Sequence, residues 1–86
     1  MDDKDKAEQA IVEYSINRGE PPEFRLQQFR TQWLASSVGA LSVAGNPIAA
    51  RDLLQKFGAQ ADANRVNMLL SDNKKRVDDF LARTLA

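Results

Sequence analysis

Glycine and proline residues divide this chain into segments that each have the spacing of an amphipathic helix. The divisions are Gly19 with Pro21 and Pro22, then Gly45-Asn46-Pro47, and finally Gly58. Glycine adopts the left-handed backbone conformation that ends many helices, whereas proline cannot continue a helix but fits its first turn. Alternating strand patterns bounded by turns are absent from the sequence. The sequence therefore predicts an all-α fold, a small irregular bundle of four to five helices in a single domain, residues 1–86.

The first segment predicts a helix over about residues 4–18, with residues 1–4 frayed. Its apolar face is formed by Ala7, Ala10, Ile11 and Tyr14. Three aspartates precede or open this segment, where acidic side chains interact favourably with the helix dipole. Gly19 and the two prolines after it end the helix.

The second segment predicts a helix that starts near Pro22 and reaches about Ala44. Its wide apolar stripe contains Leu26, Phe29, Trp33, Leu34, Val38 and Leu41. Gly39 lies in a run of small residues, where the helix either breaks or continues, and we favour the unbroken helix. A third helix follows over residues 47–57, with Asn46 as its N-cap and Pro47 in its first position.

Residues 60–85 allow two interpretations. In the one that we favour, two helices are separated by a break at Ser71-Asp72-Asn73, with one of the first two residues as an N-cap. In the other, a single helix carries a seam with alternating four- and three-residue spacing, formed by Val66, Leu70, Asn73, Val77, Phe80 and Thr84. On this second interpretation Asn73 is a polar seam residue of the kind that fixes the register of paired helices.

Composition excludes several classes of function. The chain has no His and no Cys, which removes zinc fingers, disulfide scaffolds, thiol nucleophiles and His-based acid–base catalysis. Its carboxylates form neither a convergent pair nor a calcium-loop pattern, and Gly39 to Gly45 lacks the lysine of a phosphate-binding loop. We therefore expect no catalytic residue, no cofactor and no metal.

The twenty-residue stretch over residues 31–50 carries no charge, but its polar and small residues argue against a membrane span. No export signal is evident at the start of the sequence, so we expect a cytoplasmic protein. A chain of 86 residues has a small core, with an expected stability of about 4–13 kcal/mol. Such cores are often completed by self-association, so a homodimer is compatible with the sequence.

Charge is balanced overall but unevenly distributed. The twelve basic and twelve acidic residues cancel, which argues against a binder that uses its whole surface to attract polyanions. Residues 24–60 hold four basic residues against one acidic residue, whereas residues 1–23 hold three against seven. The acidic first helix either lies against this basic middle or leaves it free for an acidic partner.

Residues 51–67 partly match a helix-turn-helix motif. Leu54, Phe57, Gly58 and Ala59 fit its first half, and polar residues of the type that contacts bases or phosphates follow. In the usual short-turn register, however, Asn64 and Asn67 point inward; a longer turn, with Asp62 as cap, points Val66 inward but loses the motif spacing. The DNA-binding candidates are Gln60, Asn64, Arg65, Asn67, Lys74, Lys75 and Arg76. An alternative interpretation of Lys74, Lys75 and Arg76 is a solvent-exposed helix face with ion pairs such as Lys75–Asp79.

By elimination, the sequence favours a non-catalytic helical module that binds another protein, as a regulator, inhibitor or assembly adaptor. The candidate partner-binding residues are Arg25, Arg30, Trp33 and Asn73, because aromatic and arginine side chains are typical interface anchors and Asn73 lies on the seam. For Trp33 a place in the core of the bundle is the favoured alternative. A DNA-binding regulator that uses residues 51–67 is the alternative function.

Overall fold

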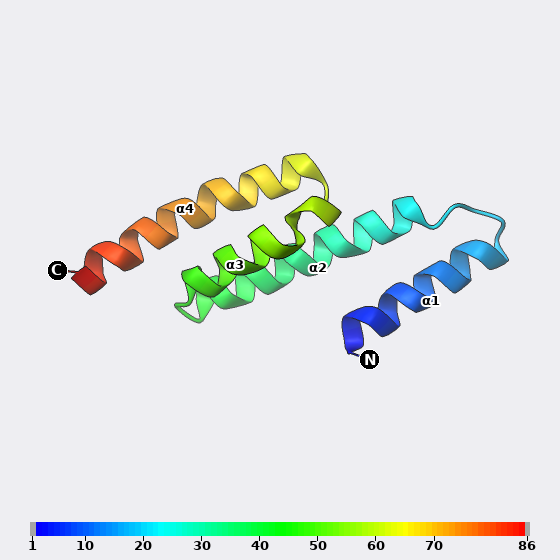
Figure 1. Ribbon diagram of the computed structural model, residues 1–86, viewed down its shortest axis with the longest axis horizontal. Helices are drawn as coiled ribbons and strands as arrows, with labels where there is room; N and C mark the ends of the chain where they lie inside the picture. Colours follow the sequence, from blue (N-terminus) through cyan, green and yellow to red (C-terminus); the bar gives the residue numbers. More distant parts are fainter. Residues whose placement is uncertain (1, 86) are drawn as a thin grey trace.

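The computed structural model describes residues 2–85, and within them the fold is all-α, as predicted. The helices are α1 (Asp3–Asn17), α2 (Glu23–Val43), α3 (Pro47–Phe57) and α4 (Ala63–Leu85), with a 3-10 turn η1 (Gly58–Gln60) before α4. Figure 1 shows α2 in the middle, with α1 beside its first half and α3 running back along its second half. Helix α4 then returns along α3, and the whole is elongated, 57 × 26 × 17 Å.

The helix ends follow the capping chemistry of the sequence. The Asp2 carboxylate accepts a hydrogen bond from the amide of Asp5 at the start of α1, and the Asn46 side chain accepts one from the amide of Ala49 at the start of α3. Gly19 and Gly45 end α1 and α2 with positive φ angles of 70° and 78°. Because Asp2 caps the first turn, residues 3 and 4, which were expected to fray, are helical. Met1 lies outside the described residues.

Helix α2 is unbroken through Gly39, which confirms the favoured interpretation. The glycine is exposed, and a Cβ there would meet nothing within 4 Å. Leu34 and Val38, one turn apart on the same helix, are almost fully buried. This packing outweighs the loss of about 1 kcal/mol in helix propensity that a glycine brings.

The predicted break at residues 71–73 is wrong, because α4 is one helix from Ala63 to Leu85. Ser71 and Asp72 are exposed, and Asp72 pairs with Arg76 one turn later, a contact that supports a continuous helix. Asn73 is buried, and its side-chain amide donates to the carbonyl oxygen of Pro47 at 3.0 Å. A tertiary hydrogen bond therefore satisfies the residue that suggested a break.

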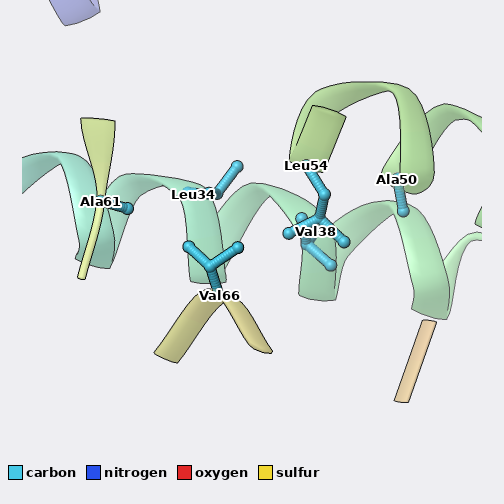
Figure 2. Packing of buried hydrophobic residues seen from close by; sticks show 6 residues of the cluster. All are labelled: Leu34, Val38, Ala50, Leu54, Ala61 and Val66. Carbon is cyan, nitrogen blue, oxygen red and sulfur yellow. The ribbon is translucent and has the colours of Figure 1, made fainter. Parts of the chain in front are cut away.

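The core lies between α2, α3 and α4. Figure 2 shows the side chains of its buried cluster, namely Leu34, Val38, Ala50, Leu54, Ala61 and Val66. Helix α1 contributes none of them, and its predicted apolar face is largely open: Ala10 and Tyr14 are exposed, whereas Ala7 and Ile11 are half-buried. The bundle thus has a packed three-helix part and a first helix attached to one side.

Candidate protein-interaction surface

Helix α1 is held on α2 by a cluster of charged and aromatic side chains. The Glu8 carboxylate accepts hydrogen bonds from Arg30, at 2.6 Å from Nη2 and 3.1 Å from Nε, and a further one from Lys4. The Lys4 ammonium also lies 5.2 Å from the centre of the Trp33 ring and 5.1 Å from that of Phe57. These two rings meet edge to face at 5.0 Å, so the cluster joins α1 to both α2 and α3.

The electrostatics of this cluster favour the ionised carboxylate. Hydrogen bonds from the Arg30 guanidinium are the largest effect, and they outweigh desolvation, which acts in the opposite direction, so that the pKa of Glu8 lies below its usual value. A second group of charges spans the end of α1: Glu20 accepts from Arg18 and from Arg25. Its pKa is likewise lowered, chiefly by the hydrogen bond from Arg18. The acidic first helix therefore lies against the basic middle of the chain.

Three of the four predicted partner-binding residues lie at the junction of α1 and α2. Arg30 pairs with Glu8, Arg25 lies 5.0 Å from the Tyr14 ring, and Trp33 is half-buried against the core. Asn73 is on α4, away from this group, and its buried amide binds Pro47. The four residues therefore do not share one surface, and partner binding through them stays a prediction.

The seven DNA-binding candidates are all exposed. Asp62 caps α4 by accepting from the amide of Arg65, and Val66 is buried, so the chain takes the longer turn that departs from helix-turn-helix spacing. In Figure 1 α3 and α4 run in nearly opposite directions, whereas the helices of that motif cross at about 90–120°. On α4, Arg76 pairs with Asp72, and none of the ion pairs among residues 2–85 joins Lys75 to Asp79. DNA binding by these residues stays a prediction.

The second half of α4 carries an exposed apolar surface that sequence reasoning missed. We define the α4 tail as residues 74–85, in which Val77 is the last buried side chain. Three large apolar side chains follow on the tail, Phe80, Leu81 and Leu85, with exposed fractions of 39%, 41% and 83%. The seam spacing from Val66 to Thr84 predicts an apolar face along α4, but it does not show how far α2 and α3 cover that face.

The tail projects because α4 is longer than the helices that it packs on. The hydroxyl of Thr31 accepts from the amide of Asp62 at the start of α4, and Asn73 binds the first residue of α3. Beyond Asn73 the twelve residues of the tail extend for about 18 Å. Figure 1 shows the end of the tail passing beyond the turn between α2 and α3. Earlier tail residues, among them Phe80 and Arg83, line a hollow together with Gly45 of this turn.

Three further features of residues 2–85 concern metal ions, membranes and surface grooves. They contain no group of three acidic, His or Cys side chains placed to hold a metal ion. None of their helices combines the length and the apolar character needed to cross a membrane. An open groove of about 600 Å³ lies between α2 and the start of α4, and it is lined by Phe24, Gln27, Gln28, Thr31, Gln32, Ala35, Asp62 and Arg65. Comparisons with protein-family models, curated proteins and solved structures find no match to this chain.

Proposed function

We propose that this protein is a non-catalytic helical interaction module, which binds an amphipathic helix of a partner protein along the α4 tail. The observation that carries the proposal is the apolar surface of the tail, where Leu85 is largely exposed and Leu81 and Phe80 are partly exposed, Phe80 beside the turn between α2 and α3. Adjacent exposed apolar side chains on a small protein are typical of binding surfaces. A cytoplasmic site of action is part of the proposal.

A helix is the expected occupant because the apolar face of α4 already binds helices along its first half. There Val66 is buried and Leu69 packs on the core formed with α2 and α3, and Val77 is still buried at the start of the tail. Phe80 and Thr84 continue the same seam spacing into the tail. A partner helix at the tail would therefore extend an existing helix–helix interface.

The size of the surface sets the expected strength of binding. Full burial of a leucine or phenylalanine side chain contributes about 1.5–3 kcal/mol. Phe80 and Leu81 are already more than half covered, and association itself costs several kcal/mol. We therefore expect weak, reversible binding.

Site-specific photo-crosslinking tests the proposal. A photoreactive residue replaces Leu81 in the full chain, and the matched control replaces Met68, which is also an exposed apolar residue of α4 but lies in its packed half. Crosslinked proteins from native cells are identified by mass spectrometry, and the one specific to position 81 is purified and titrated. We expect Leu81→Glu to weaken its binding at least tenfold and Met68→Glu to leave it unchanged. Equal crosslinking at both positions, or equal binding by both variants, would refute the proposal.

A further inference from the structure

The contacts of α1 differ from those of the other helices. Ser15 is its single buried side chain, and the Ser15 hydroxyl has no hydrogen-bond partner among the described residues. Tyr14 and Ile16 are 49% and 62% exposed, and no residue of the core cluster comes from α1. Removing α1 from its place therefore takes no side chain out of the buried core cluster of α2, α3 and α4.

The face that α1 covers is specific in its chemistry. It presents the Arg30 guanidinium beside the edge-to-face rings of Trp33 and Phe57. Helix α1 matches it with Glu8 toward the guanidinium and Lys4, one turn earlier, over the two rings. This face fits a helix that carries a basic residue and, four positions later, an acidic one.

The connection between α1 and α2 suits a helix that moves as a unit. The amides of Gly19 and Glu20 bond back to the carbonyl oxygens of Ile16 and Ser15, both at 2.9 Å, and so close the end of α1 within itself. Two prolines follow, which have no backbone N–H to donate and resist joining α1 and α2 into one helix.

We propose that this face binds α1 of a second copy of the chain, so that two copies exchange their first helices in a closed two-fold dimer. Each copy carries both the helix and its receiving face, and the exchange restores the same contacts between chains. Binding within one chain competes, with an effective concentration of about millimolar order for so short a linker. The exchanged dimer therefore forms at high local concentration, or when binding within the chain is blocked.

Charge reversal blocks the contact within a chain but permits it between chains. In the single variants Glu8→Arg and Arg30→Glu, like charges face each other, so α1 is released and the emission of Trp33, the only tryptophan, moves to longer wavelength. In an equimolar mixture each α1 meets an opposite charge on the other chain. We expect the mass from sedimentation to double and the Trp33 emission to return. The chain carrying both changes restores the pair within itself, and it serves as a monomeric control with wild-type emission.

Three results would overturn the proposal. The mixture remains monomeric at several hundred micromolar protein, or the single variants keep wild-type emission, or each single variant dimerises as readily as the mixture. The third result would indicate pairing through another surface, which Leu81→Glu on the α4 tail would then abolish. Circular dichroism of every variant measures whether α2, α3 and α4 stay folded.

Discussion

Asn73 anchors the longest helix, and its replacement by alanine tests that role directly. The residue is 2% exposed, and its side-chain amide donates to the Pro47 carbonyl oxygen at 3.0 Å, across 26 residues of sequence. A buried hydrogen bond contributes about 0.5–1.5 kcal/mol, and a buried group left without its partner costs about 1–3 kcal/mol. Alanine is the better helix former by up to about 0.7 kcal/mol, which offsets part of the loss.

We therefore expect Asn73→Ala to lower the free energy of unfolding by about 1–2 kcal/mol, a sizeable part of the roughly 4–13 kcal/mol expected for this chain. For a domain of this size that corresponds to a decrease in Tm of about 5–10 °C. Asn73→Asp, which has the same shape but places a carboxylate against the carbonyl oxygen, should be more destabilising than alanine. Ser71→Ala, at an exposed position of the same helix, should change the stability by less than about 0.5 kcal/mol.

Thermal and urea denaturation followed by circular dichroism measure these differences. Sedimentation over a range of concentrations is measured in parallel, because a register-fixing asparagine in paired helices predicts a different result. If Asn73→Leu raised the stability and changed the mass in solution, the anchoring role inferred from the Pro47 hydrogen bond would be wrong. Unchanged melting of both the alanine and the aspartate variants would contradict it equally.

Trp33→Ala should lower the free energy of unfolding by about 3 kcal/mol, which urea denaturation measures. This is the lower end of the range for a core aromatic residue, because the Trp33 ring is only half-buried against Phe57. Gly45→Ala should destabilise the protein by about 1–2 kcal/mol, because the φ angle of Gly45 is +78°. Gly39→Ala should stabilise the protein by up to about 1 kcal/mol, because Gly39 lies inside α2 with open space around the new Cβ. Thermal melts compare the two variants. Docking of α1 should depend on pH, because the pKa of Glu8 in the folded protein is lower than its ordinary value of 4.5. The ionised carboxylate therefore contributes fully to docking above pH 4.5, and this contribution is lost as the pH falls through the lower pKa of the folded protein. Trp33 emission in acid reports this release, and Glu8→Gln should remove the transition.

Local chemistry in the sequence determined most helix boundaries. Asp2 and Asn46 act as caps because a side-chain oxygen accepts a free amide of the first turn, and this needs only neighbours in sequence. Gly19 and Gly45 end helices because a left-handed residue is strongly disfavoured without glycine. The all-α class followed from the same local rules and from helical periodicity, whereas the unbroken α2 also depends on the burial of Leu34 and Val38, which outweighs the low helix propensity of Gly39.

The proposed interaction surface depends on the relative lengths of α2, α3 and α4 and on their tertiary contacts, which capping and periodicity do not predict. The seam of α4 has one spacing from Val66 to Thr84, but only the packing of α2 and α3 decides that Val77 is buried and Leu85 is exposed.

The charge imbalance predicted that acidic and basic segments attract each other, yet only the fold brings Glu8 to Arg30 across 22 residues. Asn73 shows the same division most clearly. Its neighbours Ser71 and Asp72 predict a break in the helix at this position, whereas the seam spacing predicts a residue that fixes the register of paired helices. Its long-range hydrogen bond to Pro47 favours the continuous helix. A side-chain amide that has this partner no longer competes for the hydrogen bonds of the helix backbone.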